Sequence, residues 1–488
     1  MSRRAGTPAP RALLLGAIAL VPALVLFTLW RWAAGRAEGA DPPPPTPSTV
    51  IAPRPPAAPL STPVLSWRRV PGLVARDVNL EAFQAAVTGF AGQLNDTSCV
   101  SVSLDGVPVG ARHPDLALIP ASNQKLLTGA VALEVLGPDH VYATELRGPA
   151  PTGGVIAGDV YLVGGGDPLL TSSTYPVRND RYPVASPTSL DALVDGLAAA
   201  GVTRITGAVR GDGSRYDDEF FAPSWSTDVH VIEAGPYDAL LVNDARQTGD
   251  EFKAADPAEG AARELVQLLA ARGITVDGGA GVDATPSDAG VLASVTSAPM
   301  SAVVEEMLGA SDNNTAEMLV KELGFVAGEA GSRDAGLAVM DRTLASWGLS
   351  GFHLADGSGL SNDNRVSCAV LAAVLGRHVP DDALGAGLPV AGESGTLVDV
   401  FTDSPVAGRL RAKTGTLGNP PYNADPPAAK SLSGYLPVGG GGTIAFALIL
   451  NGAGALADQG VYRPIWDALA ATLAAYPAGP GPADLAPR

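Results

Sequence analysis

The stretch IPASNQKLL, residues 119–127, places Ser122 and Lys125 three positions apart, directly ahead of an apolar run. Lysine is rare in this chain, because only five of the 32 basic residues are lysine and the other 27 are arginine. A lysine can lose its proton and act as a base, whereas an arginine in a protein cannot. Positions three apart share one face of a helix, so the Lys125 amine can lie against the Ser122 hydroxyl and activate it as a nucleophile.

The surroundings of the pair would decide whether it is reactive. Burial would lower the pKa of Lys125 and favour its neutral, basic form. The N-terminus of a helix would favour negative charge that develops near Ser122. Taken alone, however, a Ser-x-x-Lys pattern is more typical of a capping serine followed by a surface lysine.

Two further motifs change this interpretation. SDN at 311–313 offers a hydroxyl and an amide just before a helix, although the same letters are also a common helix cap. KTG at 413–415, within RAKTGTL, reads as a strand whose glycine lets another backbone approach closely, and it uses another of the scarce lysines. The three patterns lie on a helix start, a loop before a helix and a strand, so we expect them to form one site.

This set of motifs resembles the superfamily of serine β-lactamases and penicillin-binding proteins. The chain between Lys125 and Ser311 is far longer than a helical subdomain requires. The D-alanyl-D-alanine carboxypeptidase/endopeptidase family, known as class C low-molecular-mass penicillin-binding proteins, is similar in carrying large inserted domains there. GDVYLVGGGDPLLT at 158–171 and DGSGLS at 356–361 also resemble stretches of that family. The resemblance covers roughly residues 76–475 and includes all three motifs without departure.

The fold that this resemblance implies is of the α/β (α+β) class, with an antiparallel sheet flanked by helices and with large inserted β-rich domains. We expect the catalytic domain to comprise residues 74–140 and 295–475, and the insertion to comprise residues 141–294. The sequence pattern agrees at several places. CVSVSLDGVPVGARHP alternates apolar and polar residues around a DG turn, which predicts a hairpin. RLRAKTGTL, AKSLSGYLP and TIAFALILNG read as sequential antiparallel strands before a final helix.

The resemblance also implies catalytic roles. Ser122 would be the acylated nucleophile and Lys125 its base. Ser311 would relay a proton between the lysines and the leaving nitrogen. Asp356 in DGSGLS could also be catalytic, but we favour a structural role for it in a turn.

The remaining motif residues would bind the substrate. Asn313 would hold the substrate amide and Lys125. Lys413, with Thr414, would face the terminal carboxylate, and Gly415 would let another backbone approach the strand closely. The backbone N–H groups of Ser122 and Thr416 would form the oxyanion hole.

The function implied is a serine DD-peptidase that trims peptidoglycan stem peptides through an acyl-enzyme and that β-lactams acylate as covalent inhibitors. A β-lactamase or esterase of the same fold, and a non-catalytic wall-binding or β-lactam-sensing ectodomain, are the alternatives. We expect no cofactor and no metal site, because the five histidines form no tight ligand spacing. The formal net charge of −18 argues against nucleic acid as a partner.

The N-terminal segment predicts export. An uncharged run over residues 12–30 is long enough to span a bilayer, and the arginines before it favour a cytoplasmic stub at 1–11. The run would serve as an anchor, or as a signal peptide whose cleavage releases the protein. Residues 31–73 are rich in proline and read as a linker, and residues 476–488 as a disordered tail. The body would then lie outside the cell membrane.

The only two cysteines, Cys99 and Cys368, both fall in the part that would be exported. A lone pair in an oxidising compartment often forms a disulfide, although two buried free thiols are the alternative. We favour a disulfide that joins the first strand of the catalytic domain to the helical stretch after DGSGLS.

Overall fold

The structure is a computed structural model that describes residues 24–32, 70–175, 185–249, 252–418, 428–439, 442–455 and 459–486. The chain divides into two units, Met1–Val70 and Pro71–Arg488. The second unit contains the folded body, and its elements are described by themselves below.

The N-terminal unit has one described helix, at residues 24–32. The predicted stub, residues 12–23 of the predicted span and residues 33–69 of the predicted linker lie outside the described residues. Among the helices that the structure does describe, none has both the length and the apolar composition needed to cross a membrane.

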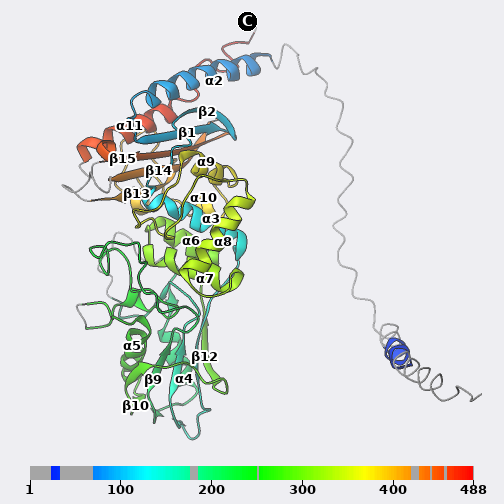
Figure 1. Ribbon diagram of the computed structural model, residues 1–488, viewed down its shortest axis with the longest axis vertical. Coiled ribbons are helices and arrows are strands. Elements are labelled where there is room, and N and C mark those ends of the chain that lie inside the picture. Colours follow the sequence, from blue (N-terminus) through cyan, green and yellow to red (C-terminus); the bar gives the residue numbers. More distant parts are fainter. Residues whose placement is uncertain are drawn as a thin grey trace, which may run out of the picture. The chain divides into compact units, whose positions relative to one another are not determined.

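A five-stranded antiparallel sheet organises the body, in the order β13-β14-β15-β1-β2 (Figure 1). The strands are β1 Ser98–Leu104, β2 Val107–Arg112, β13 Arg411–Leu417, β14 Ala429–Val438 and β15 Gly442–Asn451. Asp105 and Gly106 connect β1 to β2, and both have positive φ, as a tight turn between such strands requires. Every residue of β1 pairs with β15, so strands from the two ends of the body are neighbours.

Helices from the two ends of the body cover one face of this sheet. They are α2 Val70–Ala91 and α11 Gln459–Ala474. Phe83 of α2 and Trp466 of α11 belong to one buried cluster with Phe446 of β15. Alternate residues of β15, such as Ile449, point to the opposite face and join a second buried cluster. Both faces of β15 are thus covered, which explains why the strand is almost continuously apolar.

The second face carries the helices that hold two of the three motifs. They are α3 Gln124–Val135, α6 Met300–Gly309, α7 Asn313–Ala327, α8 Arg333–Ser346, α9 Cys368–Gly376 and the short α10 Ala383–Ala386. Leu127 of α3, Met307 of α6 and Leu319 of α7 are all fully buried in the cluster that includes Ile449 of β15. The α+β class expected from the sequence, with an antiparallel sheet flanked by helices, is confirmed.

The chain between α3 and α6 builds a second part with its own core. It contains two sheets. The larger, in the order β11-β9-β5-β3-β12, combines parallel and antiparallel pairs, whereas the smaller, in the order β10-β8-β4, is parallel. The larger one comprises β3 Ala143–Gly148, β5 Val160–Val163, β9 Val209–Asp212, β11 Ala280–Val282 and β12 Gly290–Thr296, and the smaller one β4 Val155–Ile156, β8 Arg204–Ile205 and β10 Thr275–Val276. Helices α4 Asp191–Ala199 and α5 Pro257–Ala271 and the pair β6 Leu170–Thr171 and β7 Thr188–Ser189 complete it.

A loop region of this second part reaches the motif-bearing helices. Tyr216, Trp225 and Tyr237 are buried in one cluster with Met318 of α7 and Leu360 of the DGSGLS stretch. The inserted chain therefore packs directly against elements next to the predicted site.

The C-terminal segment contacts α2. Asn79 of α2 donates a hydrogen bond from Nδ2 to the carbonyl of Pro480 at 3.2 Å and accepts one from the N–H of Gly479. Gly479 and Pro480, which lie in the segment 476–488 for which the sequence predicts disorder, are thus bonded to the first helix of the body.

The two cysteines are joined in a disulfide. Cys99 lies in β1 and Cys368 is the first residue of α9, so the bond ties the sheet to a helix of its second face. Both residues are fully buried. The partners are those expected from the sequence.

Replacing both Cys99 and Cys368 by serine should lower the free energy of unfolding by about 2–5 kcal/mol, because the bond closes a loop of 269 residues and so constrains the unfolded chain. Urea unfolding of the oxidised protein and of the double variant measures the difference. The wild-type protein with its disulfide reduced serves as a control for the serine side chains. Equal unfolding free energies in all three samples would contradict a stabilising role for the bond.

Candidate active site

The predicted nucleophile lies in a tight turn just before α3. Residues Ala121–Asn123 form a short 3-10 turn, and Lys125 follows in the first turn of the α-helix. Ala121 has a φ of 48°, an uncommon conformation for a residue with a side chain. Gly359 packs against this turn so closely that a Cβ there would lie 2.0 Å from the Ala121 carbonyl oxygen. The DGSGLS stretch therefore supports the turn that presents Ser122.

Lys125 is the centre of the polar network. Its Nζ donates hydrogen bonds to Asn313 Oδ1 at 2.6 Å, to the Ser358 carbonyl at 2.7 Å and to Ser122 Oγ at 3.2 Å. Burial lowers the pKa of Lys125 to about 8, although nearby carboxylates, first that of Asp312, partly oppose this shift. A neutral Lys125 can keep its two shorter bonds as a donor and direct its lone pair at the Ser122 hydroxyl. The geometry therefore suits a general base.

Ser311 and Lys413 form a second serine–lysine pair. Ser311 has a φ of 60° and lies in the three-residue connection between α6 and α7, where Asp312 caps α7 by accepting the Thr315 N–H. Lys413 Nζ donates to Ser311 Oγ and to the Thr414 carbonyl, each at 2.8 Å. Burial, and then the charge of Lys125, hold the pKa of Lys413 well below its usual value. Lys413 is thus suited to orient the Ser311 hydroxyl rather than to present a positive charge.

Strand β13 closes the site from the other side. A Cβ at Gly415 would lie 2.1 Å from Ser431 Oγ and 3.1 Å from the Pro120 carbonyl oxygen, so glycine is required for this close approach. Ser431 of β14 also donates a hydrogen bond to the Pro120 carbonyl at 2.7 Å. These contacts bring the backbone next to Thr416 close to the turn that holds Ser122, as an oxyanion hole shared by their N–H groups requires.

The motif residues share one cleft. The residues lining it include six of those predicted from the sequence, which are Ser122, Ser311, Asn313, Thr414, Gly415 and Thr416. Lys125 and Lys413 are fully buried behind them. The structure therefore brings together all eight residues that the three motifs predict, from three separate segments of the chain.

The cleft also contains residues that sequence reasoning missed. Lys430, Thr396, Glu233, Tyr462 and Trp466 line it as well. Lys430 was detectable in principle, because it is one of only five lysines in the chain. The others belong to segments without a recognisable motif, so no signal in the sequence singles them out.

Asp356 and Glu317 organise the wall behind Lys125. Asp356 accepts hydrogen bonds from the N–H groups of Gly359 and Ser361 and from Trp225 Nε1. Glu317 accepts from the N–H of Ser358 at 2.7 Å, and burial, followed by the charge of Asp356, raises the pKa of Glu317 to about 8. Both carboxyl groups hold the backbone that presents the Ser358 carbonyl to Lys125. The interpretation of Asp356 as a structural residue agrees with these contacts.

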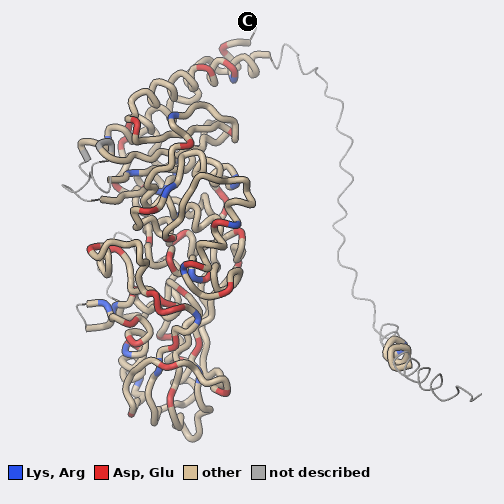
Figure 2. The backbone as a smooth tube through the Cα atoms, in the orientation of Figure 1, with Lys and Arg blue, Asp and Glu red and all other residues tan. Residues whose placement is uncertain are grey.

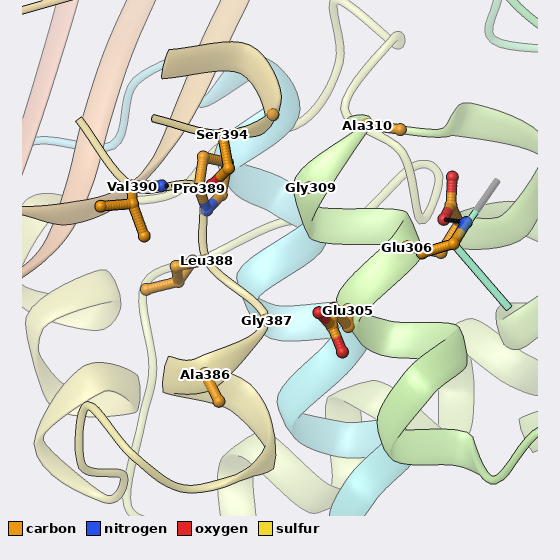
Figure 3. Close-up of a pocket in the computed structure, with 12 residues that line it drawn as sticks. Glu305, Glu306, Gly309, Ala310, Ala386, Gly387, Leu388, Pro389, Val390 and Ser394 are labelled. Atoms are coloured by element: carbon orange, nitrogen blue, oxygen red, sulfur yellow. Dashed lines mark hydrogen bonds between the residues drawn. The ribbon is translucent and has the colours of Figure 1, made fainter. Parts of the chain in front are cut away.

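A second hollow adjoins the cleft. It lies between α6 and the segment from Ala386 to Gly395, and Ala310 lines both hollows (Figure 3). Glu305 extends from α6 into the space, whereas Glu306 turns toward Ala185, whose N–H it accepts at 2.9 Å. Ala310, which lines this hollow, directly precedes Ser311 in the chain.

The charge around the cleft contrasts with that of the body. Figure 2 shows Asp and Glu distributed along both parts of the body, with Lys and Arg dispersed among them. Three of the five lysines, Lys125, Lys413 and Lys430, nevertheless meet at the cleft. In the part of the chain that the structure describes, no cluster of three or more His, Cys, Asp or Glu side chains suits a metal ion.

The rate of acylation should depend on pH through Lys125. Only the neutral amine can accept the Ser122 proton, so acylation at saturating penicillin should accelerate as the pH rises through about 8. Stopped-time labelling with a fluorescent penicillin between about pH 6 and pH 10 measures this profile. A rate that is constant over this range, or that falls with rising pH, would contradict the assignment of Lys125 as the base.

Comparisons with known proteins agree with this geometry. The model of the D-Ala-D-Ala carboxypeptidase 3 (S13) family matches residues 94–250 and 240–475. The chain is 32% identical over 436 residues to the D-alanyl-D-alanine carboxypeptidase of Actinomadura sp. (strain R39), covering 74% of this chain and 77% of that protein. It is also 32% identical over 381 residues to a carboxypeptidase of Mycobacterium tuberculosis, covering 75% of this chain and 76% of the relative.

A solved structure shows the same fold. Penicillin binding protein 4 from Haemophilus influenzae superposes with a TM-score of 0.61 at 20% identity, over 75% of this chain and 93% of that one. The resemblance on which the sequence analysis relied is therefore confirmed, and the chain belongs to the D-Ala-D-Ala carboxypeptidase 3 (S13) family.

Proposed function

We propose that this protein is a serine D-Ala-D-Ala carboxypeptidase that trims the stem peptides of peptidoglycan. The observation that carries the proposal is the pair of serine–lysine contacts in one cleft. Ser122 lies beside a buried Lys125, and Ser311 beside a buried Lys413. A nucleophile with its own base and a second hydroxyl for the leaving group are the two components that acyl transfer from a peptide needs.

Acylation starts when neutral Lys125 accepts the Ser122 proton and Ser122 Oγ attacks the carbonyl carbon of the penultimate D-alanine. Negative charge then develops on the carbonyl oxygen, where the N–H groups of Ser122 and Thr416 stabilise it. Ser311 passes a proton to the leaving nitrogen, and the proton that Lys125 gained replaces it. Lys413 orients the Ser311 hydroxyl throughout, and the terminal D-alanine departs.

Deacylation repeats the chemistry with water as the nucleophile. Lys125, neutral again, accepts a proton from a water molecule that attacks the acyl carbon. The bond to Ser122 Oγ breaks, and the serine regains its proton. Asn313 holds the amide of the acyl chain through this step, while its Nδ2 is fixed by the Glu233 carbonyl at 2.8 Å.

A β-lactam would enter the same reaction as far as the acyl-enzyme. Its ring carbonyl takes the place of the scissile carbonyl, and Ser122 is acylated. Since the leaving nitrogen of a β-lactam stays tethered to the acyl group, it can block the approach of water. Slow release of bound penicillin would separate a DD-peptidase from a β-lactamase of the same fold, which must release it quickly.

Endopeptidase action is a second candidate, and the hollow beside Ser311 favours it (Figure 3). Cleavage of a cross-link requires space for a whole peptide on the leaving side. The hollow between α6 and Ala386–Gly395 meets the cleft at Ala310, directly before Ser311 in the chain. A leaving group larger than D-alanine would find room there.

We further propose that the body acts outside the cell membrane. The support is the sequence of residues 12–30, with its uncharged run and preceding arginines. Whether this run anchors the protein or is removed as a signal peptide can be tested by sequencing the N-terminus of the exported protein.

The proposed function is tested with purified muropeptides. Residues 71–488 are incubated with a pentapeptide monomer and with a cross-linked dimer, and the products are identified by mass. Release of D-alanine from the monomer supports carboxypeptidase action, and conversion of dimer to monomers supports endopeptidase action. If neither substrate changes while Ser122 is still acylated by penicillin, the proposal of a DD-peptidase fails and a β-lactam-sensing role gains support.

A further inference from the structure

Lys430 is a buried lysine of the cleft to which neither the motifs nor the mechanism above assigns a role. It lies on β14 directly opposite Thr416 of β13. Its Nζ donates a hydrogen bond to Thr416 Oγ1 at 2.8 Å and lies 4.2 Å from the centre of the Tyr462 ring. Only 6% of the residue is exposed, and it lines the cleft. A charged group is thus held at the wall of the site, next to an oxyanion-hole residue.

The positive charge of Lys430 lacks a compensating carboxylate within the described residues. Burial, and then the charge of Arg463, lower the pKa of Lys430 to about 8, and no carboxylate offsets these effects. By contrast, Lys321 contacts Asp217 at 2.6 Å and Lys253 contacts Asp244 at 2.8 Å. A buried ammonium without a carboxylate partner is unfavourable unless an anion arrives with the ligand.

Thr416 is prepared to bind an anion together with Lys430. A hydroxyl that accepts a hydrogen bond from an ammonium must direct its own proton elsewhere, because its oxygen faces the donor. Since Thr416 also lines the cleft, this proton is available to a ligand there. An ammonium and a hydroxyl side by side are suitable donors for the two oxygens of a carboxylate.

Lys413, which the sequence suggests as the carboxylate anchor, is less suited to that task. Its Nζ is engaged by Ser311 Oγ and by the Thr414 carbonyl, and the residue is fully buried. To reach a substrate carboxylate it would have to give up the contact that orients Ser311. Lys413 is therefore placed to orient the Ser311 hydroxyl, whereas Lys430 is placed to meet a ligand in the cleft.

We propose that Lys430, together with the Thr416 hydroxyl, binds the terminal carboxylate of the substrate, and that Lys413 serves the Ser311 hydroxyl instead. This inference rests on the proposed function, since only a substrate with a free C-terminus offers that carboxylate. It assigns to Lys430 the selection of C-terminal peptides over neutral substrates.

The test compares a matched pair of substrates, an acylated D-Ala-D-Ala peptide and the same peptide with a C-terminal amide. For Lys430→Met, kcat/KM with the free carboxylate should fall by about 10- to 100-fold, mostly through KM, as expected for the loss of a charge-assisted hydrogen bond. The loss with the amide should be smaller by about tenfold or more. Lys430→Arg, which keeps the charge, should recover part of the preference for the carboxylate.

Lys413→Met is the matched control, because it removes a lysine from the neighbouring strand β13. It should lower kcat for both substrates by similar factors, since both need a proton at the leaving nitrogen. If Lys430→Met does not fold, Lys430→Gln tests the same point, because an amide can still donate to Thr416 but carries no charge. Thermal unfolding of each variant checks the fold.

Two results would overturn the inference. One is an equal loss for the two substrates in Lys430→Met and Lys430→Gln. The other is a selective loss for the carboxylate in Lys413→Met. Both are distinct from failure of the proposed function, in which the wild-type protein would release no D-alanine from the free peptide at all.

Discussion

Ser122→Ala is expected to abolish covalent labelling by a fluorescent penicillin and to lower the turnover of a D-Ala-D-Ala peptide by at least about 10³-fold. The variant removes the only atom that can form the acyl-enzyme, while Lys125, Asn313 and Ser311 stay in place. Little else changes, because the Ser122 side chain is half-buried and its one described side-chain contact, to Lys125, is the longest of the three that Lys125 makes.

Labelled protein resolved by gel electrophoresis and peptide mapping provides the measurement. The melting temperature of the variant should remain close to that of the wild type. Ser311→Ala is an informative companion, since it removes the second hydroxyl of the cleft but keeps the nucleophile. Labelling of the Ser122→Ala protein at the wild-type rate would exclude Ser122 as the nucleophile.

Lys125→Met is the second variant with a large expected effect. Acylation should slow by about 10²- to 10⁴-fold, as expected for the loss of a general base, and the rise in rate near pH 8 should disappear. The variant leaves Asn313 Oδ1 and the Ser358 carbonyl without their donor, so some loss of stability should accompany it.

Lys321→Met separates the two effects. Lys321 of α7 is also fully buried and bonded to backbone carbonyls, those of Asp217 and Glu219, but it lies outside the cleft. It should lose stability while keeping the wild-type rate of acylation and its dependence on pH. An Lys125→Met protein that is acylated as fast as Lys321→Met would show that the base is another group.

The sequence alone was sufficient to predict those parts of the site whose residues form short, local patterns. Ser122 and Lys125 were found because their spacing is local and lysine is scarce. The hairpin of β1 and β2 was found because strict alternation surrounds an Asp-Gly turn. In each case the decisive interaction joins residues a few positions apart, and such interactions are visible in a single sequence.

The rest of the site depends on contacts between distant segments. Lys430 gains its position from the register of β14 against β13, which pairs it with Thr416, and no local pattern encodes that register. The sequence could not show that Lys413 Nζ donates to Ser311 Oγ or that the residue is fully buried, and our proposal to assign the carboxylate to Lys430 instead depends on these two observations. Thr396 is a similar case, since only the fold brings it within 2.8 Å of Thr414 Oγ1.

The pairing of β1 with β15 has a consequence for the order in which the enzyme is made. A ribosome delivers β1 and the Ser122 turn early, but β13, β14 and β15 emerge only after the whole inserted part has been synthesised. Until then β1 lacks β15, one of its two neighbours in the finished sheet, and the turn that holds Ser122 lacks β13, whose Gly415 packs against it. Ser122 is therefore part of an incomplete site during synthesis, and we expect hydrolytic activity only after the last strands have been synthesised and have folded. We therefore expect a polypeptide truncated before β15 to be inactive, although it would carry every residue of the three motifs.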